Sequence, residues 1–203
     1  NALLGVAANS GSVTYTPDAD YNGNDTITMQ AYDGADYGDP LYVPVTVTAT
    51  NDAPTRVIPI GTQMVTEDAA YNFNVATSNA FTDIDGNALT YSATYLDAAG
   101  TAVAVPATAT GGFWLSMTDA GVFSGTPDND DVGNLIVTVT ATDGALSVDD
   151  TFTLTVANTN DDPTVPNVIA NQAATEDTNF TFTVPLNTFD DVDEGDTLTY
   201  SAA

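Results

Sequence analysis

The chain has 203 residues and a formal net charge of −27, because Asp and Glu together number 28 whereas Lys and Arg together number one. Nucleic acids and anionic membrane surfaces are bound chiefly through clusters of Lys and Arg, so this composition excludes both as partners. The apolar fraction of 43% falls into alternating patterns, which predicts a folded chain rather than a disordered acidic one.

Catalysis is narrowly limited by the residue types present. The sequence has no His, no Cys and no Lys, and its one basic residue is Arg56. Ser-His-Asp, Cys-His and Schiff-base chemistry are therefore excluded. A carboxylate pair could still serve a glycosidase, but the acids gather at predicted module ends, so we expect no enzyme. Without disulfides, an extracellular chain needs another source of stability, and bound calcium is the obvious candidate.

Two kinds of apolar segment are not visible in the sequence. It has no run of about 18 apolar residues, the length that predicts a transmembrane helix. It also has no charged and apolar leader at Asn1. We therefore expect neither a membrane-inserted segment nor a signal peptide within these residues.

The chain repeats itself with a period of about 109 residues. In chain order, Thr16-Pro17-Asp18 recurs as Thr126-Pro127-Asp128, and the linker Asn51-Asp52-Ala53-Pro54 recurs as Asn160-Asp161-Asp162-Pro163. A period of this length without a helical pattern predicts a modular array. We expect the C-terminal half of one module at residues 1–51, a complete module at 52–161, and the N-terminal half of the next at 162–203.

Apolar and polar residues alternate along short segments of the complete module, which predicts half-buried strands. The residues expected to face the core are Tyr71, Phe73, Val75, Val137, Val139, Ala141, Phe152, Leu154 and Val156. About seven such strands per module, separated by Gly, Pro, Asn and Asp, predict an all-β chain of Greek-key β-sandwiches.

Four short motifs add a resemblance to a known family. They are Glu67 near the first strand, Asp83-Ile84-Asp85-Gly86, the strand end Ala141-Thr142-Asp143-Gly144, and the Asn-Asp-x-Pro linkers. With these motifs the chain resembles, over its whole length, the cadherin-like repeats of large bacterial surface adhesins of the RTX type. The resemblance implies tandem Greek-key β-sandwich modules of the cadherin or immunoglobulin type, on a secreted or cell-surface protein.

In that family the matching residues bind Ca²⁺ at the junctions between modules. Calcium takes six to eight hard oxygen ligands at about 2.3–2.6 Å, and an extended Asp-x-Asp segment points both carboxylates the same way. The resemblance implies a first site made by Asn51, Asp52, Asp83, Asp85 and Asp143, with Asp18 or Asp20 contributing from the preceding module. It implies a second site made by Glu67, Asn158, Asn160, Asp161, Asp162, Asp191 and Asp193.

The sequence also departs from the animal members of that family. Ala49 and Asn158 stand where animal cadherins carry a further linker Asp, and their Asp-Arg-Glu segment is missing. We therefore expect one or two ions at each junction rather than three.

These patterns predict a structural extender that is stiffened by calcium and whose partners are the adjacent modules of the same chain. The alternative is a module that binds carbohydrate or protein through Trp114, although the flanking Phe113 and Leu115 favour a core position for that residue. The two half-modules have unpaired strand edges, and such edges predict head-to-tail self-association between chains.

Overall fold

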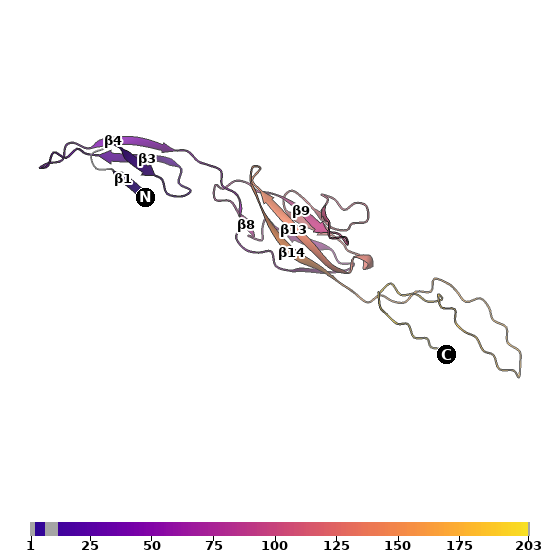
Figure 1. Ribbon diagram of the computed structural model, residues 1–203. Coiled ribbons are helices and arrows are strands. Elements are labelled where there is room, and N and C mark those ends of the chain that lie inside the picture. Colours follow the sequence, from indigo (N-terminus) through magenta and orange to yellow (C-terminus); the bar gives the residue numbers. More distant parts are fainter. Residues whose placement is uncertain (1–2, 7–11, 203) are drawn as a thin grey trace.

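The computed structural model describes residues 3–6 and 12–202 of the chain. Figure 1 shows three parts in succession: a group of strands near the N-terminus, a β-sandwich in the middle, and a C-terminal part that follows an extended path. Within the described residues, strands and one 3₁₀ turn are the only regular elements. The predicted all-β class is confirmed. None of the described residues form a helix with the length and apolarity needed to cross a bilayer.

The first part contains two antiparallel pairs of strands. β1 (Leu3–Val6) pairs with β2 (Val13–Thr16), and β3 (Gly23–Met29) pairs with β4 (Leu41–Val47). Half-buried and exposed residues alternate along β3 and over most of β4, because only one face of the hairpin is apolar. No residue of β2, β3 or β4 is fully buried. β2 lies over part of this face, since Tyr15 Oη donates to Asp25 Oδ2 at 2.9 Å, but the described residues leave the face only half-covered.

The middle part is a sandwich of two main sheets. The larger sheet has the strand order β10-β9-β13-β14-β6, the smaller has β11-β12-β7, and β5 pairs separately with β8. The bounds are β5 (Thr55–Arg56), β6 (Gln63–Thr66), β7 (Tyr71–Asn74), β8 (Phe81–Thr82), β9 (Thr90–Leu96), β10 (Ala102–Ala104), β11 (Ser116–Met117), β12 (Val122–Gly125), η1 (Asn129–Asp131), β13 (Gly133–Thr142) and β14 (Ser147–Ala157).

β14 pairs with a neighbouring strand on each side and leads directly into the second linker. It pairs along its length with β13 in antiparallel fashion, from Gly133 opposite Val156 to Thr142 opposite Ser147. On its other side it pairs with β6 in parallel. Because parallel strands end at the same edge of a sheet, the residue after β6 and the linker after β14 emerge together. This arrangement positions the candidate site described below.

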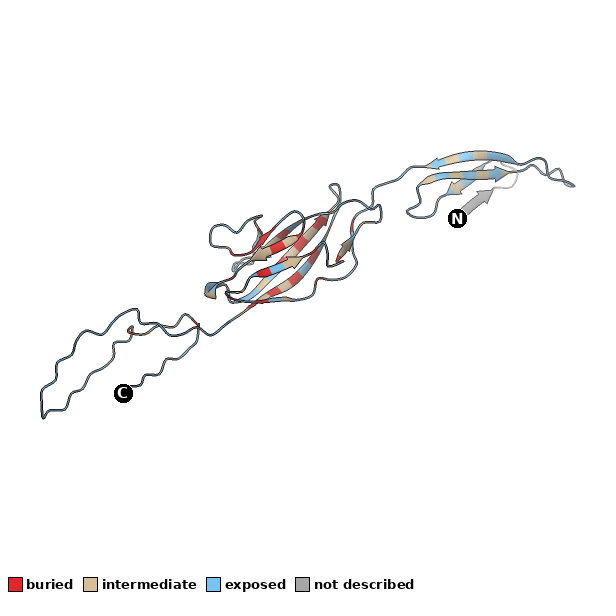
Figure 2. Cartoon of the chain, turned by 180° about the vertical axis from the view of Figure 1, so that it is seen from behind, coloured by how far each residue is buried: buried red, intermediate tan, exposed pale blue. Residues whose placement is uncertain are grey.

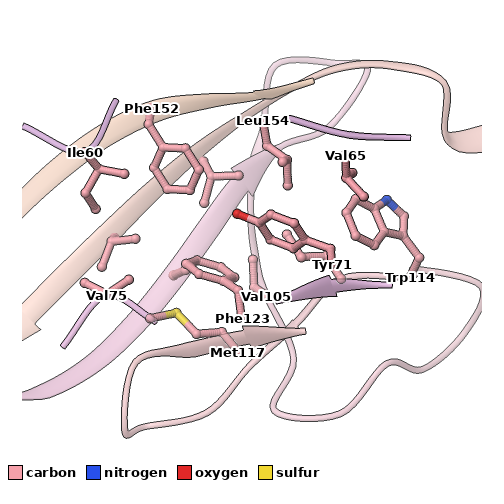
Figure 3. Packing of buried hydrophobic residues seen from close by; sticks show 14 of the residues in the cluster. Ile60, Val65, Tyr71, Val75, Val105, Trp114, Met117, Phe123, Phe152 and Leu154 are labelled. Atoms are coloured by element: carbon pink, nitrogen blue, oxygen red, sulfur yellow. The ribbon is translucent and has the colours of Figure 1, made fainter. Parts of the chain in front are cut away.

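The core lies between the two sheets, and the predicted inward residues occupy it. Val137, Val139 and Ala141 are each 0% exposed. Figure 3 shows Phe152, Phe123 and Leu154 converging on one another inside the sandwich. In Figure 2 the buried residues gather in the middle part, whereas the first part is coloured as half-buried or exposed. The strand faces expected from the period-two alternation are confirmed.

Trp114 belongs to this core. It is 8% exposed, and its ring meets that of Tyr71 edge-on at a centroid distance of 6.1 Å. Gly125 lies against it so closely that a Cβ atom there would be 2.2 Å from the carbonyl oxygen of Trp114. The core position favoured by the sequence is confirmed, and Trp114 is not available as a platform for a sugar ring.

The one basic side chain of the protein is bound to β14. Arg56 Nη1 lies 2.6 Å from Asp150 Oδ1, and the side chain of Asp150 is 1% exposed. The backbone N–H of Ile60 donates to the other oxygen, Asp150 Oδ2, at 2.6 Å. A buried carboxylate without such partners would cost several kcal/mol, on the order of 3–5. The pair therefore ties the segment after the first linker to the middle of the large sheet.

The last part is extended but forms no sheet. Within residues 163–202, the only strand-like pairing is an isolated bridge between Thr164 and Asp190. Large apolar side chains remain exposed, among them Val168 at 86% and Leu186 at 98%. The segments one repeat earlier are β6, β7 and β9, which pair with β14, β12 and β13. Corresponding partner strands for this part are absent from the described residues.

Replacing Arg56 should destabilise the sandwich through Asp150. Arg56→Met leaves the buried carboxylate without its counter-charge, so we expect the free energy of unfolding to fall by about 2 kcal/mol. Arg56→Met/Asp150→Asn should recover much of this loss, because an uncharged amide still accepts from Ile60. Urea unfolding followed by the fluorescence of Trp114 measures both variants. Equal losses in the two would contradict a role for the buried charge.

Candidate functional site

Three carboxylates from separate stretches of the chain meet beside the second linker. Glu67 directly follows β6, Asp161 lies in the linker, and Asp193 belongs to the last part. One oxygen from each of these side chains lies within 4.8 Å of the others. Glu67 is 3% exposed and Asp193 is 6% exposed. We call this group the junction cluster.

Glu67 reaches the junction cluster because β6 and β14 run in parallel. Its backbone N–H donates to Ala157 at 3.1 Å, and its Oε1 accepts from the backbone N–H of Thr159 in the linker. Its second oxygen, Oε2, is buried and has no hydrogen-bond partner within the described part of the chain. A buried carboxylate oxygen without a donor is costly, and a bound cation would remove that cost.

Asp193 is held in its charged form by three donors. The backbone N–H of Asp161 donates to Oδ2 at 2.7 Å, and the side-chain amides of Asn158 and Asn129 donate to Oδ1 at 2.9 and 3.4 Å. The N–H of Asp161, followed by the amide of Asn158, lowers the pKa of Asp193 below its ordinary value. The carboxylate is therefore an anion at neutral pH.

The protein has no basic side chain to neutralise the junction cluster. Arg56 is the single Lys or Arg in the sequence, and it pairs with the buried Asp150 of β14. Glu67 and Asp193 are too deeply buried for bulk water to solvate them fully. The counter-charge for these three acids has to come from solution.

A second acidic group shares Asp193 with the junction cluster. Asp191, Asp193 and Asp196 also place one oxygen each within 4.8 Å of one another. The backbone N–H of Asp193 donates to Asp191 Oδ1 at 3.1 Å, which fixes the turn between them. The two groups are adjacent, and either could hold a metal ion.

The residues predicted for the first junction also lie together. The amide of Asn51 donates to Asp143 Oδ2 at 2.8 Å, and the N–H of Asp52 donates to Asp85 Oδ2 at 2.7 Å. Asp83 accepts from the N–H of Asp85 at 2.9 Å, and its other oxygen is buried without a hydrogen-bond partner in the part of the chain that the structure describes. The amide of Asn51 also donates to the backbone oxygen of Asp52 at 3.2 Å. All five predicted residues therefore belong to one hydrogen-bonded set, in which Asp52 takes part through its backbone.

Asp143 is likewise held as an anion. The N–H of Leu146, the amide of Asn51 and the N–H of Ala145 lower the pKa of Asp143 below its ordinary value. This Asp follows the end of β13, so the strand delivers it to the same end of the sandwich as the first linker. Its charge is thus available to a cation bound there.

Two clefts flank the first linker. One has a volume of about 320 Å³ and is lined by Asp20, Asp52 and Asp85, among others. The other has a volume of about 450 Å³, and its lining again includes Asp20 and Asp52. Sequence reasoning left Asp18 and Asp20 as alternatives for the preceding module. The structure puts Asp20 into the lining of both clefts.

Two predicted residues stand apart from the junction cluster. Asn160 is exposed and donates to the backbone oxygen of Asp161 at 2.8 Å. Asp162 is exposed as well. Both belong to the linker itself, and neither side chain is among the acids of the junction cluster.

Three polar residues at the junctions were missed by sequence reasoning. Asn129 in η1 donates to Asp161 and Asp193 at 3.4 Å, and Asn87 donates to Asn51 at 2.8 Å. Asp196 joins the second acidic group. Asn87 and Asp196 are counterparts in the repeat, each directly after a Gly, and this equivalence was the signal that could have revealed them. Asn129 had no such signal.

Comparison with protein families identifies the building unit. The model described as "Putative Ig domain" matches residues 53–157 and again 162–203, and so covers most of the chain. The chain belongs to this family of Ig domains. The model described as "Bacterial Ig domain" matches residues 2–49. Tandem Ig domains thus account for all three parts, and bacterial Ig domains are typical of secreted and cell-surface proteins.

Several solved structures are similar to the chain at a low level. An endo-fucoidan hydrolase of glycoside hydrolase family 107 is 21% identical, over 77% of this chain and 22% of its own, with a TM-score of 0.34. Titin domain M7 is 22% identical, over 54% and 98%, with a TM-score of 0.33. The titin domains z1z2 in complex with telethonin are 15% identical, over 78% and 73%, with a TM-score of 0.37.

This chain of Ig domains spans only 22% of the length of that hydrolase. No curated protein matches the chain.

Acid should weaken the first junction of the Ig array through Asp143. The pKa of Asp143 is lower in the folded protein than in the unfolded chain, where it is about 4. The charged side chain therefore contributes its full stabilisation above about pH 4, and this contribution is lost as the pH falls through the lower folded-state pKa. In chelator, we expect Asp143→Asn to lose less stability than wild type on acidification. Urea unfolding over a pH series measures this difference. Asp39→Asn, at an exposed acid outside both junctions, serves as the control, and parallel profiles for Asp143→Asn and wild type would contradict the assignment.

Proposed function

We propose that this chain is a structural extender of a secreted or cell-surface protein, in which calcium bound at the linkers stiffens successive Ig domains. The observation that carries the proposal is the buried oxygen Glu67 Oε2, which has no hydrogen-bond partner in the described part of the chain and lies among two further carboxylates. A group of three acids without a basic neighbour is stabilised by a cation that binds among them.

The available ligands favour calcium over other metals. The junctions offer carboxylate oxygens, Asn side-chain oxygens and linker carbonyls, and they offer no thiolate or imidazole because the sequence has no Cys and no His. Hard oxygen ligands suit Ca²⁺ and Mg²⁺. Ca²⁺ tolerates irregular coordination by many oxygens, whereas Mg²⁺ demands a near-ideal octahedron and retains its waters.

The proposed ligands follow from the two hydrogen-bonded sets. At the first junction they are Asn51, Asp52, Asp83, Asp85 and Asp143. At the second junction they are Glu67, Asn158, Asp161, Asp191 and Asp193, with Asn129 and Asp196 close by and the carbonyls of Asn160 and Asp162 within the linker. An Asn that now donates its amide N–H to an acid needs only a rotation of the amide to offer its oxygen to an ion.

Calcium at such a site would join domains that are otherwise held by a linker. The junction cluster takes Glu67 from the middle domain, Asp161 from the linker and Asp193 from the following part. Unneutralised, these carboxylates repel one another and favour separation of the domains. An ion shared among them restricts the angle between successive domains, and the array then acts as a rod rather than a flexible string.

The setting we propose is a large bacterial surface adhesin. The motif resemblance to cadherin-like repeats of RTX-type adhesins supports it, as does the match to bacterial Ig domains over residues 2–49. We propose no catalytic role, since the acids serve the linkers. A role as a carbohydrate-binding module has less support, because its main candidate residue, Trp114, is buried in the core.

Thermal unfolding in calcium, magnesium or chelator tests the proposal. Ligand at 100 times its dissociation constant adds about 2.7 kcal/mol to the folded state, which raises the midpoint by several degrees. We expect this rise with millimolar Ca²⁺, a much smaller one with Mg²⁺, and a narrower distribution of lengths by small-angle X-ray scattering in Ca²⁺ alone. Similar midpoints in all three buffers would refute the calcium role.

A matched pair of variants localises the effect. Glu67→Gln removes one charge from the junction cluster, and we expect it to reduce the calcium-dependent rise. Glu176→Gln changes the counterpart one repeat later, which is exposed and outside the cluster, and it should respond to calcium like the wild type. Equal responses of the two variants would show that calcium acts elsewhere.

A further inference from the structure

The two linkers share one backbone contact with the domain that follows. At the first linker, the N–H of Asp52 donates to Asp85 Oδ2 at 2.7 Å, and at the second, the N–H of Asp161 donates to Asp193 Oδ2 at 2.7 Å. In each case the acceptor is the second Asp of an Asp-x-Asp turn. The turn has this geometry in the complete middle domain, so it is a property of the repeat. The two junctions can therefore be compared residue by residue.

The second junction adds two side-chain amides on the other oxygen of this acceptor. Asn158, which directly follows β14, donates to Asp193 Oδ1 at 2.9 Å. Asn129 of η1 donates to the same oxygen and to Asp161 Oδ2, both at 3.4 Å. Contacts of 3.4 Å are long, but an ionised acceptor strengthens the donors aimed at it. We call Asn129 and Asn158 the amide brace.

The amide brace crosses the second junction. Asn129 and Asn158 belong to the middle domain and to its immediate end, whereas Asp193 belongs to the part that follows the linker. In Figure 1, β14 leads directly into this linker. Turning the following part about the linker would break the bonds of both amides to Asp193. Because the donors are neutral, they bind the carboxylate with no metal ion present.

The first junction has alanine at both positions of the brace. Ala19 corresponds to Asn129, and Ala49 corresponds to Asn158, in the alignment given by the repeat. A methyl group neither donates nor accepts a hydrogen bond, so these two positions supply no amide to Asp85.

The hydrogen bonds that the first linker makes run in one direction only. The amide of Asn51 donates to Asp143, and the N–H of Asp52 donates to Asp85. Both acceptors belong to the middle domain, so these bonds fix the linker to that domain. They place no constraint on the angle of the part that precedes the linker, and relative motion is the ordinary behaviour of domains joined in this way.

We propose that the two junctions are mechanically different: the amide brace holds the second junction at a fixed angle without a metal ion, whereas the first is a hinge that turns until a cation binds. This inference goes beyond the calcium role and does not depend on it. Calcium bound as proposed above would then change the range of angles mainly at the first junction. An array built in this way bends at selected linkers and stays straight at others.

Distances between paired spin labels, measured by pulsed electron paramagnetic resonance in chelator, test the proposal. The sequence has no Cys, so labels attach only where a Cys is introduced. Asn24→Cys/Ala88→Cys spans the first junction, and Asn134→Cys/Thr197→Cys spans the second at equivalent positions of the repeat; all four residues are exposed. We expect the distance distribution at the first junction to be about twice as wide as at the second.

Exchanging the brace between the junctions assigns the difference to the amides. Asn129→Ala/Asn158→Ala should widen the distribution at the second junction to that of the first. Ala19→Asn/Ala49→Asn should narrow the distribution at the first, and this variant removes no contact on which folding depends. Gln172→Ala serves as the control, because it removes an amide that bonds only to Ala170 within the last part, and it should change neither width.

Equal widths at the two junctions of the wild type would overturn the proposal. So would a second junction whose width is unchanged by Asn129→Ala/Asn158→Ala. Repeating the measurement in millimolar Ca²⁺ separates this inference from the calcium role. If Ca²⁺ narrows neither distribution, the calcium role fails, while the comparison in chelator still decides whether the amide brace stiffens the second junction.

Discussion

The scarcity of positive charge governs this molecule. The sequence has one guanidinium and 28 acidic side chains, and the guanidinium is bound to Asp150, a buried carboxylate of the large sheet. Every other acid must remain in water, accept hydrogen bonds from neutral backbone or side-chain donors, or share a cation from solution. We propose that cation sharing is concentrated at the two linkers, because turns and strand ends from both sides of each linker place their carboxylates there.

The parallel pairing of β6 with β14 connects the core to the junction. Inward residues of β14 form much of the apolar interior, while its last residue leads directly into the linker. Since β6 ends at the same edge, Glu67 is placed beside Thr159 without any loop to position it. The stability of the sandwich and the geometry of the junction cluster thus depend on the same few backbone hydrogen bonds. A substitution in the core of this sheet should therefore alter the geometry of the junction cluster.

Much of the fold could be read from the sequence, because strand faces follow a strict alternation and the repeat reveals the linkers. Val137, Val139 and Leu154 are buried where the pattern placed them. The motif acids also come together, since a strand end or a tight turn leaves a side chain few directions. Asn129 was beyond reach, because its approach to Asp193 depends on how successive domains meet rather than on local spacing. Likewise, alternation predicts that residues 180–184 favour a strand, but it cannot say whether a partner strand is present.

The tie between Arg56 and Asp150 has a mechanical consequence. The chain enters the middle domain through the first linker, is bound at once to β14 by this ion pair and by Ile60, and then runs parallel to β14 as β6. It leaves the domain from the end of β14 itself. Tension applied along the array is therefore transmitted through strands that must slide past one another lengthwise. Their hydrogen bonds resist together as a group, whereas strands peeled from one end would release them one at a time.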